Sequence, residues 1–133
     1  MYDVAIIGAG PAGASAAIFT AKAGKKTIVI DSDQSVTRRA WIANHYGAPD
    51  VSGPDLVDIG KKQAAKFGAE FVTGKVTKVT AGEGSVTIET EGQSYEATHV
   101  ILATGMFADA AEASGVRTTP GTEPRIKTII ACT

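Results

Sequence analysis

An apolar run followed at once by three closely spaced glycines constrains the fold of this chain more than any other feature. Residues 4–17 read VAIIGAGPAGASAA, and the glycines of this stretch are Gly8, Gly10 and Gly13. A continuous apolar run is typical of a strand that is covered on both faces. The order of apolar run, glycines and alanines therefore predicts a strand, a tight turn and a helix.

The next residues extend this prediction to a complete β-α-β unit. Alanine-rich residues 11–23 favour a helix, with Pro11 at its start and Gly24 at its end. Residues 27–30 form a second apolar run, which Asp31 closes. The unit spans about 30 residues, the length at which a crossover helix joins two parallel strands. We therefore expect an α/β fold with a parallel sheet.

The spacing G-x-G-x-x-G is a weak signal alone, but the acidic residue after the second strand strengthens it. The first glycine permits the tight turn, the second lets the backbone approach a pyrophosphate, and the third lets the helix lie close to the strand. The helix start then offers N–H groups and the positive end of its dipole to phosphates. Asp31 stands where a carboxylate accepts hydrogen bonds from an adenosine ribose. The pattern predicts a dinucleotide that contains AMP.

The spacing leaves the identity of the dinucleotide open. Asp31 would repel a phosphate on the ribose 2′-oxygen, which argues against NADP. Arg38 and Arg39 are the residues that would neutralise such a phosphate, although a solvated loop pair is the simpler interpretation. FAD and NAD both remain compatible with the residues.

Length and charge predict one domain, residues 1–133, of a globular protein. A net charge of -1 and a pI near 6.1 give no basic field for nucleic acid or for an anionic membrane. No apolar run reaches the length of a membrane span and no signal-peptide pattern precedes the first strand, so we expect a cytoplasmic location. His45 and His99 lack metal-ligand spacing, and we expect no metal site.

The rest of the chain predicts a second helix and a β-meander. Residues 32–53 are irregular and polar, and residues 54–67 are expected to form a helix. Apolar and polar residues then alternate, which predicts antiparallel strands near residues 75–80, 85–90 and 93–97. A separate buried strand is expected at residues 99–102, so the meander replaces one crossover helix. A short helix at residues 108–113 and a strand at residues 126–130 complete the prediction.

Four stretches of the chain together resemble a known family. They are DVAIIGAGPAGASAAIFTAKAG, ANHYGAPDVSGPDLVDIGKKQAAKFGAEF, the predicted meander and HVILATG, and they cover most of residues 3–105. In this combination the chain resembles the FAD-binding domain of the thioredoxin reductase group of flavoprotein oxidoreductases. The second stretch is the most specific, because the glycine pattern occurs in many families. The resemblance implies a Rossmann-like FAD/NAD(P)-binding domain with the meander as a crossover.

The resemblance also implies which residues contact the cofactor. Those at the pyrophosphate are Gly8, Gly10, Pro11, Ala12 and Gly13. Asp31 is implied at the ribose, Val76 beside the adenine through its backbone, and Asn44 near the flavin end. Thr104 and Gly105 are implied near the ADP half. No catalytic side chain is expected, because the isoalloxazine ring of FAD carries the electrons.

The chain departs from this family in its cysteine content and at its C-terminal end. Cys132 has no partner cysteine for a redox dithiol, and a second nucleotide domain for NADPH is absent from the 133 residues. The sequence stops about where relatives close the flavin site. We therefore expect an FAD/NAD(P)-binding domain that is incomplete at its C-terminus. Its unpaired sheet edge favours a homodimer.

The expected function is that of an FAD-binding oxidoreductase domain with NAD(P)H as the electron donor. The NAD(P)H site would come from a redox partner protein, a second subunit or diffusive access. One alternative is an NAD-binding enzyme or sensor domain that uses the same glycine pattern. Another is a non-catalytic nucleotide-binding or interaction module, which the missing dithiol favours.

Overall fold

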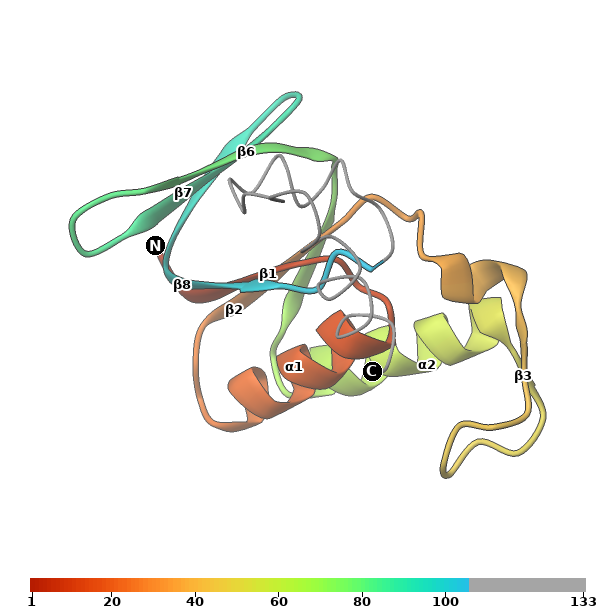
Figure 1. Cartoon of the computed structure of the whole chain (residues 1–133). Coiled ribbons are helices and arrows are strands. Elements are labelled where there is room, and N and C mark those ends of the chain that lie inside the picture. The colour runs from red at the N-terminus through yellow and green to blue at the C-terminus, as the bar shows by residue number, and fades with distance from the viewer. Residues whose placement is uncertain (106–133) are drawn as a thin grey trace, which may run out of the picture.

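The computed structural model describes residues 1–105, which form a six-stranded sheet. Helices cover one face of the sheet, and its last three strands form a β-meander that curls over the other face (Figure 1). The strand order is β5-β2-β1-β8-β7-β6. The strands are β1 (Tyr2–Ile7), β2 (Thr27–Asp31), β5 (Glu70–Thr73), β6 (Val76–Ala81), β7 (Val86–Thr90) and β8 (Ser94–Leu102). The other elements are α1 (Pro11–Lys22), the 3-10 helix η1 (Val36–Arg39), the short ribbon of β3 (Trp41–Ile42) and β4 (Val51–Ser52), and α2 (Gly53–Lys66).

The centre of the sheet is parallel, with β1 between β2 and β8. Ile6 of β1 lies opposite Val29 of β2 and Ile101 of β8. β5 adds in parallel to the outer side of β2. The loops that follow these strands therefore meet at one edge of the sheet, which is where open α/β sheets bind ligands.

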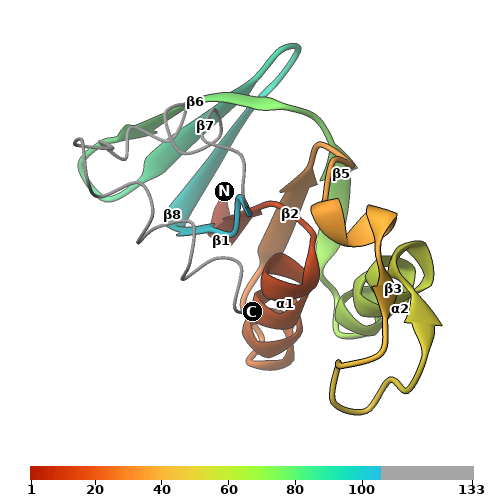
Figure 2. The ribbon, with the colours of Figure 1, turned by 45° about the vertical axis from the view of Figure 1, so that its right-hand side comes forward.

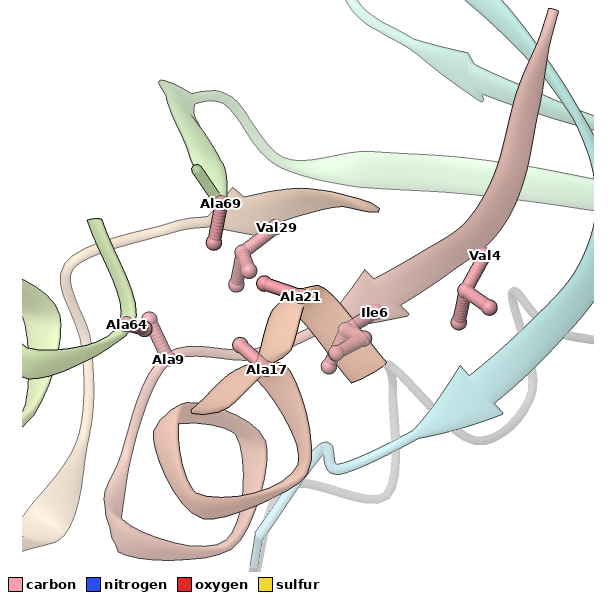
Figure 3. Close-up of a cluster of buried hydrophobic side chains, with 8 residues drawn as sticks. All are labelled: Val4, Ile6, Ala9, Ala17, Ala21, Val29, Ala64 and Ala69. Carbon is pink, nitrogen blue, oxygen red and sulfur yellow. The ribbon is translucent and has the colours of Figure 1, made fainter. Parts of the chain in front are cut away.

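Small side chains let the two helices lie close to the sheet and to each other. α1 and α2 lie side by side on one face (Figure 2). A Cβ added at Gly60 of α2 would lie 3.1 Å from the Cβ of Ala14 of α1. The buried cluster under the helices is mostly alanine (Figure 3): Val4, Ile6, Ala9, Ala17, Ala21, Val29, Ala64 and Ala69. Larger residues would force the helices away from the strands, which explains the alanine-rich sequence of α1.

The meander packs on the opposite face of β1 and β2. The buried cluster there consists of Ala5, Ile7, Ile28, Ile30, Val76, Ile88 and Ala97. Both faces of β1 are thus covered, as its uninterrupted apolar run predicts. Within residues 1–105, neither helix combines the length and the apolar character that a membrane crossing requires.

The α/β fold, the β-α-β unit, the second helix and the meander are confirmed. α1 ends at Lys22 and α2 begins at Gly53, each one residue from the predicted boundary. Gly24 has a φ of 77°, a left-handed conformation that suits a glycine after a helix.

Two predictions about the end of the meander are wrong. The strands expected at residues 93–97 and 99–102 are the single strand β8. It is continuous because its first residues pair with β7 and its later residues pair with β1. β8 is also less buried than expected: His99 is exposed, because α1 lies mainly over β1 and β2.

The sequence did not predict four short elements. β5 was not recognised, and η1, β3 and β4 lie in the stretch that was expected to be irregular. The predicted helix at residues 108–113, the predicted strand at residues 126–130 and Cys132 lie outside the described residues.

Candidate dinucleotide-binding site

The loop between β1 and α1 is fixed on both sides by the neighbouring strands. The N–H of Gly8 donates to the carbonyl oxygen of Ile30 at 2.9 Å, and the N–H of Ala103 donates to that of Ile7 at 2.9 Å. Gly8 has a φ of 102°, and a Cβ there would overlap the carbonyl oxygen of Ala103. Glycine is therefore required at this turn by both conformation and space.

Gly13 and Gly10 serve different purposes in the same loop. Gly13 is buried, and a Cβ there would overlap the backbone carbonyl oxygen of Gly8, so this glycine lets α1 begin close to the strand. Gly10 has an ordinary φ of -69°. A Cβ at Gly10 would meet only a side chain, the Oγ of Ser35 at 2.9 Å. The neighbour of Gly10 on this side is thus the Ser35 hydroxyl and not backbone.

The N-terminus of α1 has no capping group of its own. Gly10 is the N-cap, no side chain hydrogen bonds to the helix start, and the first turn contains no acidic residue. At α2, by contrast, the Oγ of Ser52 accepts from the N–H of Asp55 at 3.3 Å, and Asp55 lies in the first turn. The N–H groups of Ala12 and Gly13 in the first turn of α1 therefore remain for an external anion.

Asp31 ends β2 with its side chain on the helix side of the sheet. Its side chain is 9% exposed. One carboxylate oxygen, Oδ1, accepts from the N–H of Asp33 at 3.0 Å, and the other, Oδ2, lies 2.5 Å from the Nζ of Lys61 on α2. Because a carboxylate offers about four acceptor positions, Asp31 retains capacity for a further donor.

Most of the sequence-predicted residues converge on this edge of the sheet. The N–H of Gly74 donates to the carbonyl oxygen of Asp31 at 2.9 Å, which brings Val76, the buried first residue of β6, close to the end of β2. Thr104 and Gly105 directly follow Ala103, which contacts the turn at Gly8. Pro11 and Ala12 form the first turn of α1.

Asn44 is the predicted residue that the structure does not join to the others. It is exposed in the turn between β3 and β4, which projects from the body of the protein (Figure 1). Its neighbour His45 reaches closer and lines a small hollow between α1 and α2, together with Gly10 and Pro11. The β3–β4 turn thus borders the same hollow as the glycine loop through His45, whereas Asn44 does not line it.

The comparison with known proteins agrees with this geometry. Residues 2–132 match the family described as pyridine nucleotide-disulphide oxidoreductase. The chain belongs to this family. It is 41% identical over 120 residues to a thioredoxin reductase of Aquifex aeolicus, covering 86% of this chain and 37% of that protein.

Solved structures of thioredoxin reductases have the same fold as this chain. The atypical thioredoxin reductase TRi from Desulfovibrio vulgaris Hildenborough superposes with a TM-score of 0.74 at 36% identity, covering 91% of this chain and 38% of that one. A thioredoxin reductase from Gloeobacter violaceus gives a TM-score of 0.75 at 30% identity, covering 78% and 34%. The chain therefore spans little more than a third of these relatives, and the thioredoxin reductase-like fold is confirmed.

Two residues beside the glycine loop and Asp31 were not singled out in the sequence. Ser35, the N-cap of η1, stands over Gly10, and Lys61 contacts Asp31. Arg38 was interpreted as a solvated residue, but its Nε lies 2.8 Å from the Oδ1 of Asp33 and its guanidinium also reaches Asp58 at 3.4 Å. The Nε–Asp33 contact is a charge contact without hydrogen-bond alignment. Sequence spacing gave no signal for these contacts.

The start of α2 holds Ser35 in place through η1. The N–H of Gly53 donates to the carbonyl oxygen of Ala40 at 2.8 Å, and a Cβ at Gly53 would overlap the carbonyl oxygen of Thr37. Within residues 1–105, no three His, Cys, Asp or Glu side chains come together as a metal site would require.

Proposed function

We propose that this chain binds FAD through its ADP half and serves as the FAD-binding part of a thioredoxin reductase-like oxidoreductase. The observation that carries the proposal is the N-terminus of α1, which lacks both a capping side chain and an acidic residue. Such a helix start is an anion site. Its glycine loop admits a close approach, and an acceptor for ribose hydroxyls, Asp31, lies at the next strand end.

In this proposal the described residues hold the dinucleotide by hydrogen bonds from backbone and side chains. The N–H groups of Ala12 and Gly13 donate to phosphate oxygens, and the Ser35 hydroxyl over Gly10 donates to the same group. Asp31 accepts from the ribose, and the backbone of Val76 lies beside the adenine. Asn44 is left without a supporting contact, and His45 replaces it as the residue expected nearest the flavin end.

Bound FAD would supply the redox chemistry, so this chain needs no nucleophile of its own. The electron donor is expected to be NAD(P)H. Because the chain spans little more than a third of its relatives, a site for NAD(P)H and a redox partner protein are proposals for the whole protein rather than for residues 1–105.

Calorimetric titration of the chain with FAD, NAD and ADP tests this function. The informative variant is Ala12→Asp, which introduces into α1 the first-turn carboxylate that α2 already carries. It should weaken FAD and ADP binding at least about tenfold, because a carboxylate competes for the helix N–H groups and repels phosphate. Ala65→Asp, an identical change at an exposed position near the end of α2, should leave affinity unchanged.

Each result identifies one function. FAD binding that Ala12→Asp weakens and Ala65→Asp does not supports the proposal. Binding of NAD without FAD would establish the NAD-dependent alternative, and indifference to all three ligands would establish a module without nucleotide function.

We also propose that the protein forms a homodimer. The support is the sheet of residues 1–105, in which β5 and β6 end the strand order and each leave one edge without a partner strand. Sedimentation equilibrium measures the mass directly. A monomer at micromolar concentration would rule the homodimer out.

A further inference from the structure

The carboxylate of Asp31 is paired with a cation from a distant element. Lys61 lies on α2, and its Nζ is 2.5 Å from the Oδ2 of Asp31. The Lys61 side chain is 26% exposed and that of Asp31 is 9% exposed, so the pair is shielded from water more than a surface ion pair. A ribose that approaches Asp31 therefore meets a carboxylate whose charge is already compensated.

Arg38, the other cationic side chain near Asp31, is already paired with other carboxylates. Arg38 contacts Asp33 through its Nε and Asp58 through its Nη2. Two carboxylates thus surround this guanidinium, and it has no contact with Asp31 among the described residues. Lys61 is the cationic side chain that touches the predicted ribose acceptor.

We propose that Lys61 determines the affinity of this site for adenine nucleotides that carry a phosphate on the ribose 2′-oxygen. The inference rests on the proposed function, because it assumes that the ribose donates to Asp31. A hydroxyl bonded to the Oδ2 of Asp31, the oxygen that Lys61 contacts, lies about 2.7 Å from that oxygen, and hence within about 5 Å of the Lys61 Nζ. A 2′-phosphate there gains an attractive charge and faces a carboxylate that is neutralised. The site thereby accepts 2′-phosphorylated adenine nucleotides as well as unphosphorylated ones.

Lys61 acts on the site both through its charge and through its contact with Asp31. Removing either one favours ADP over a 2′-phosphorylated ligand. Without its charge, Asp31 becomes a bare carboxylate that repels a 2′-phosphate. Without the Lys61 ammonium, the Oδ2 of Asp31 also becomes available to accept a hydrogen bond from an unmodified ribose. A neutral residue at position 61 should therefore favour ADP over the 2′-phosphorylated ligand by about tenfold, the scale of one partly screened charge at this distance.

Calorimetry with ADP and adenosine 2′,5′-bisphosphate measures this preference. We expect Lys61→Met to raise the ratio of the two dissociation constants about tenfold in favour of ADP. Lys62→Met is the matched control, because Lys62 is the exposed next residue of the same helix and makes no ion pair in the described structure. It should leave the ratio within about twofold of the original. Arg38→Met should do the same, because Arg38 is held by Asp33 and Asp58.

The outcomes separate this inference from the proposed function. If the original chain binds neither ligand, the dinucleotide function fails and the inference fails with it. If ADP binds but the ratio is the same in Lys61→Met, the inference alone is wrong. A ratio that moves in Arg38→Met and not in Lys61→Met also overturns it. Should Lys61→Met fail to show cooperative thermal unfolding, Lys61→Gln removes the same charge and retains a hydrogen-bond donor to Asp31.

Discussion

Gly10→Ala should separate nucleotide binding from folding in the glycine loop. The three glycines of the loop are not equivalent, because a Cβ at Gly8 or Gly13 would overlap a backbone carbonyl oxygen. A Cβ at Gly10 would instead lie 2.9 Å from the Oγ of Ser35, a side-chain atom that is able to move. The methyl group would occupy the space in which we place the phosphate and the Ser35 hydroxyl.

The stability change expected for Gly10→Ala is small because two effects oppose each other. Gly10 has φ -69° and ψ -171°, which alanine adopts without strain. Replacing glycine at such a position stabilises by about 0.4–1 kcal/mol through the unfolded state, and the poorer fit of alanine at the N-cap of α1 offsets part of this gain. Displacing the Oγ of Ser35, which accepts from the N–H of Thr37 at 3.3 Å, costs about 0.5–1.5 kcal/mol. The melting temperature should therefore change by less than about 5 °C.

Thermal unfolding by circular dichroism and calorimetric ADP titration measure the two consequences. Gly10→Ala should unfold near the original temperature and bind ADP at least about tenfold more weakly. Gly13→Ala should lose at least about 2 kcal/mol of stability, because the backbone of Gly8 has to move. A stable Gly10→Ala protein with unchanged ADP affinity would remove Gly10 from the phosphate site. Equal destabilisation by both variants would contradict the distinction between the two glycines.

Three further changes test single contacts. Asp31→Ala should weaken ADP binding by about 1–3 kcal/mol in calorimetry, the scale of lost charge-assisted hydrogen bonds, and undiminished affinity would refute the ribose contact. Ser52→Ala removes the acceptor for the Asp55 N–H and should lower the unfolding free energy by about 0.5–2 kcal/mol in urea titration; no change would show that α2 does not depend on this cap. The hydrogen bond from the Tyr2 hydroxyl to Glu70, then burial and the charge of Glu70, raise the pKa of Tyr2 above its usual value. A raised pKa favours the protonated form in the folded state, so this contribution is complete below about pH 10 and is lost as the pH rises through the folded pKa. Urea titrations from pH 8 to 11 should show a smaller loss of stability in Tyr2→Phe than in the original chain, and parallel curves would refute the assignment.

The local elements of the site were predictable because their signals lie within a few residues of one another. The apolar run of β1, the three glycines and the alanines of α1 follow directly in the chain. Backbone conformation and periodic burial act over that range, so the β-α-β unit and the position of Asp31 were correct. β8 was divided wrongly because no local pattern shows that one strand pairs first with β7 and then with β1.

The sequence by itself determined that this chain would form a β-α-β unit with a glycine turn and an acidic strand end. Only the tertiary structure decided what surrounds those groups: Ser35 over Gly10, and Lys61 beside Asp31. Periodicity reports which face a residue occupies on its own element, whereas the partner of Asp31 comes from a helix thirty residues later in the chain. That meeting depends on how α2 packs against α1 and η1, through close approaches at Gly60 and Gly53 that no local pattern encodes.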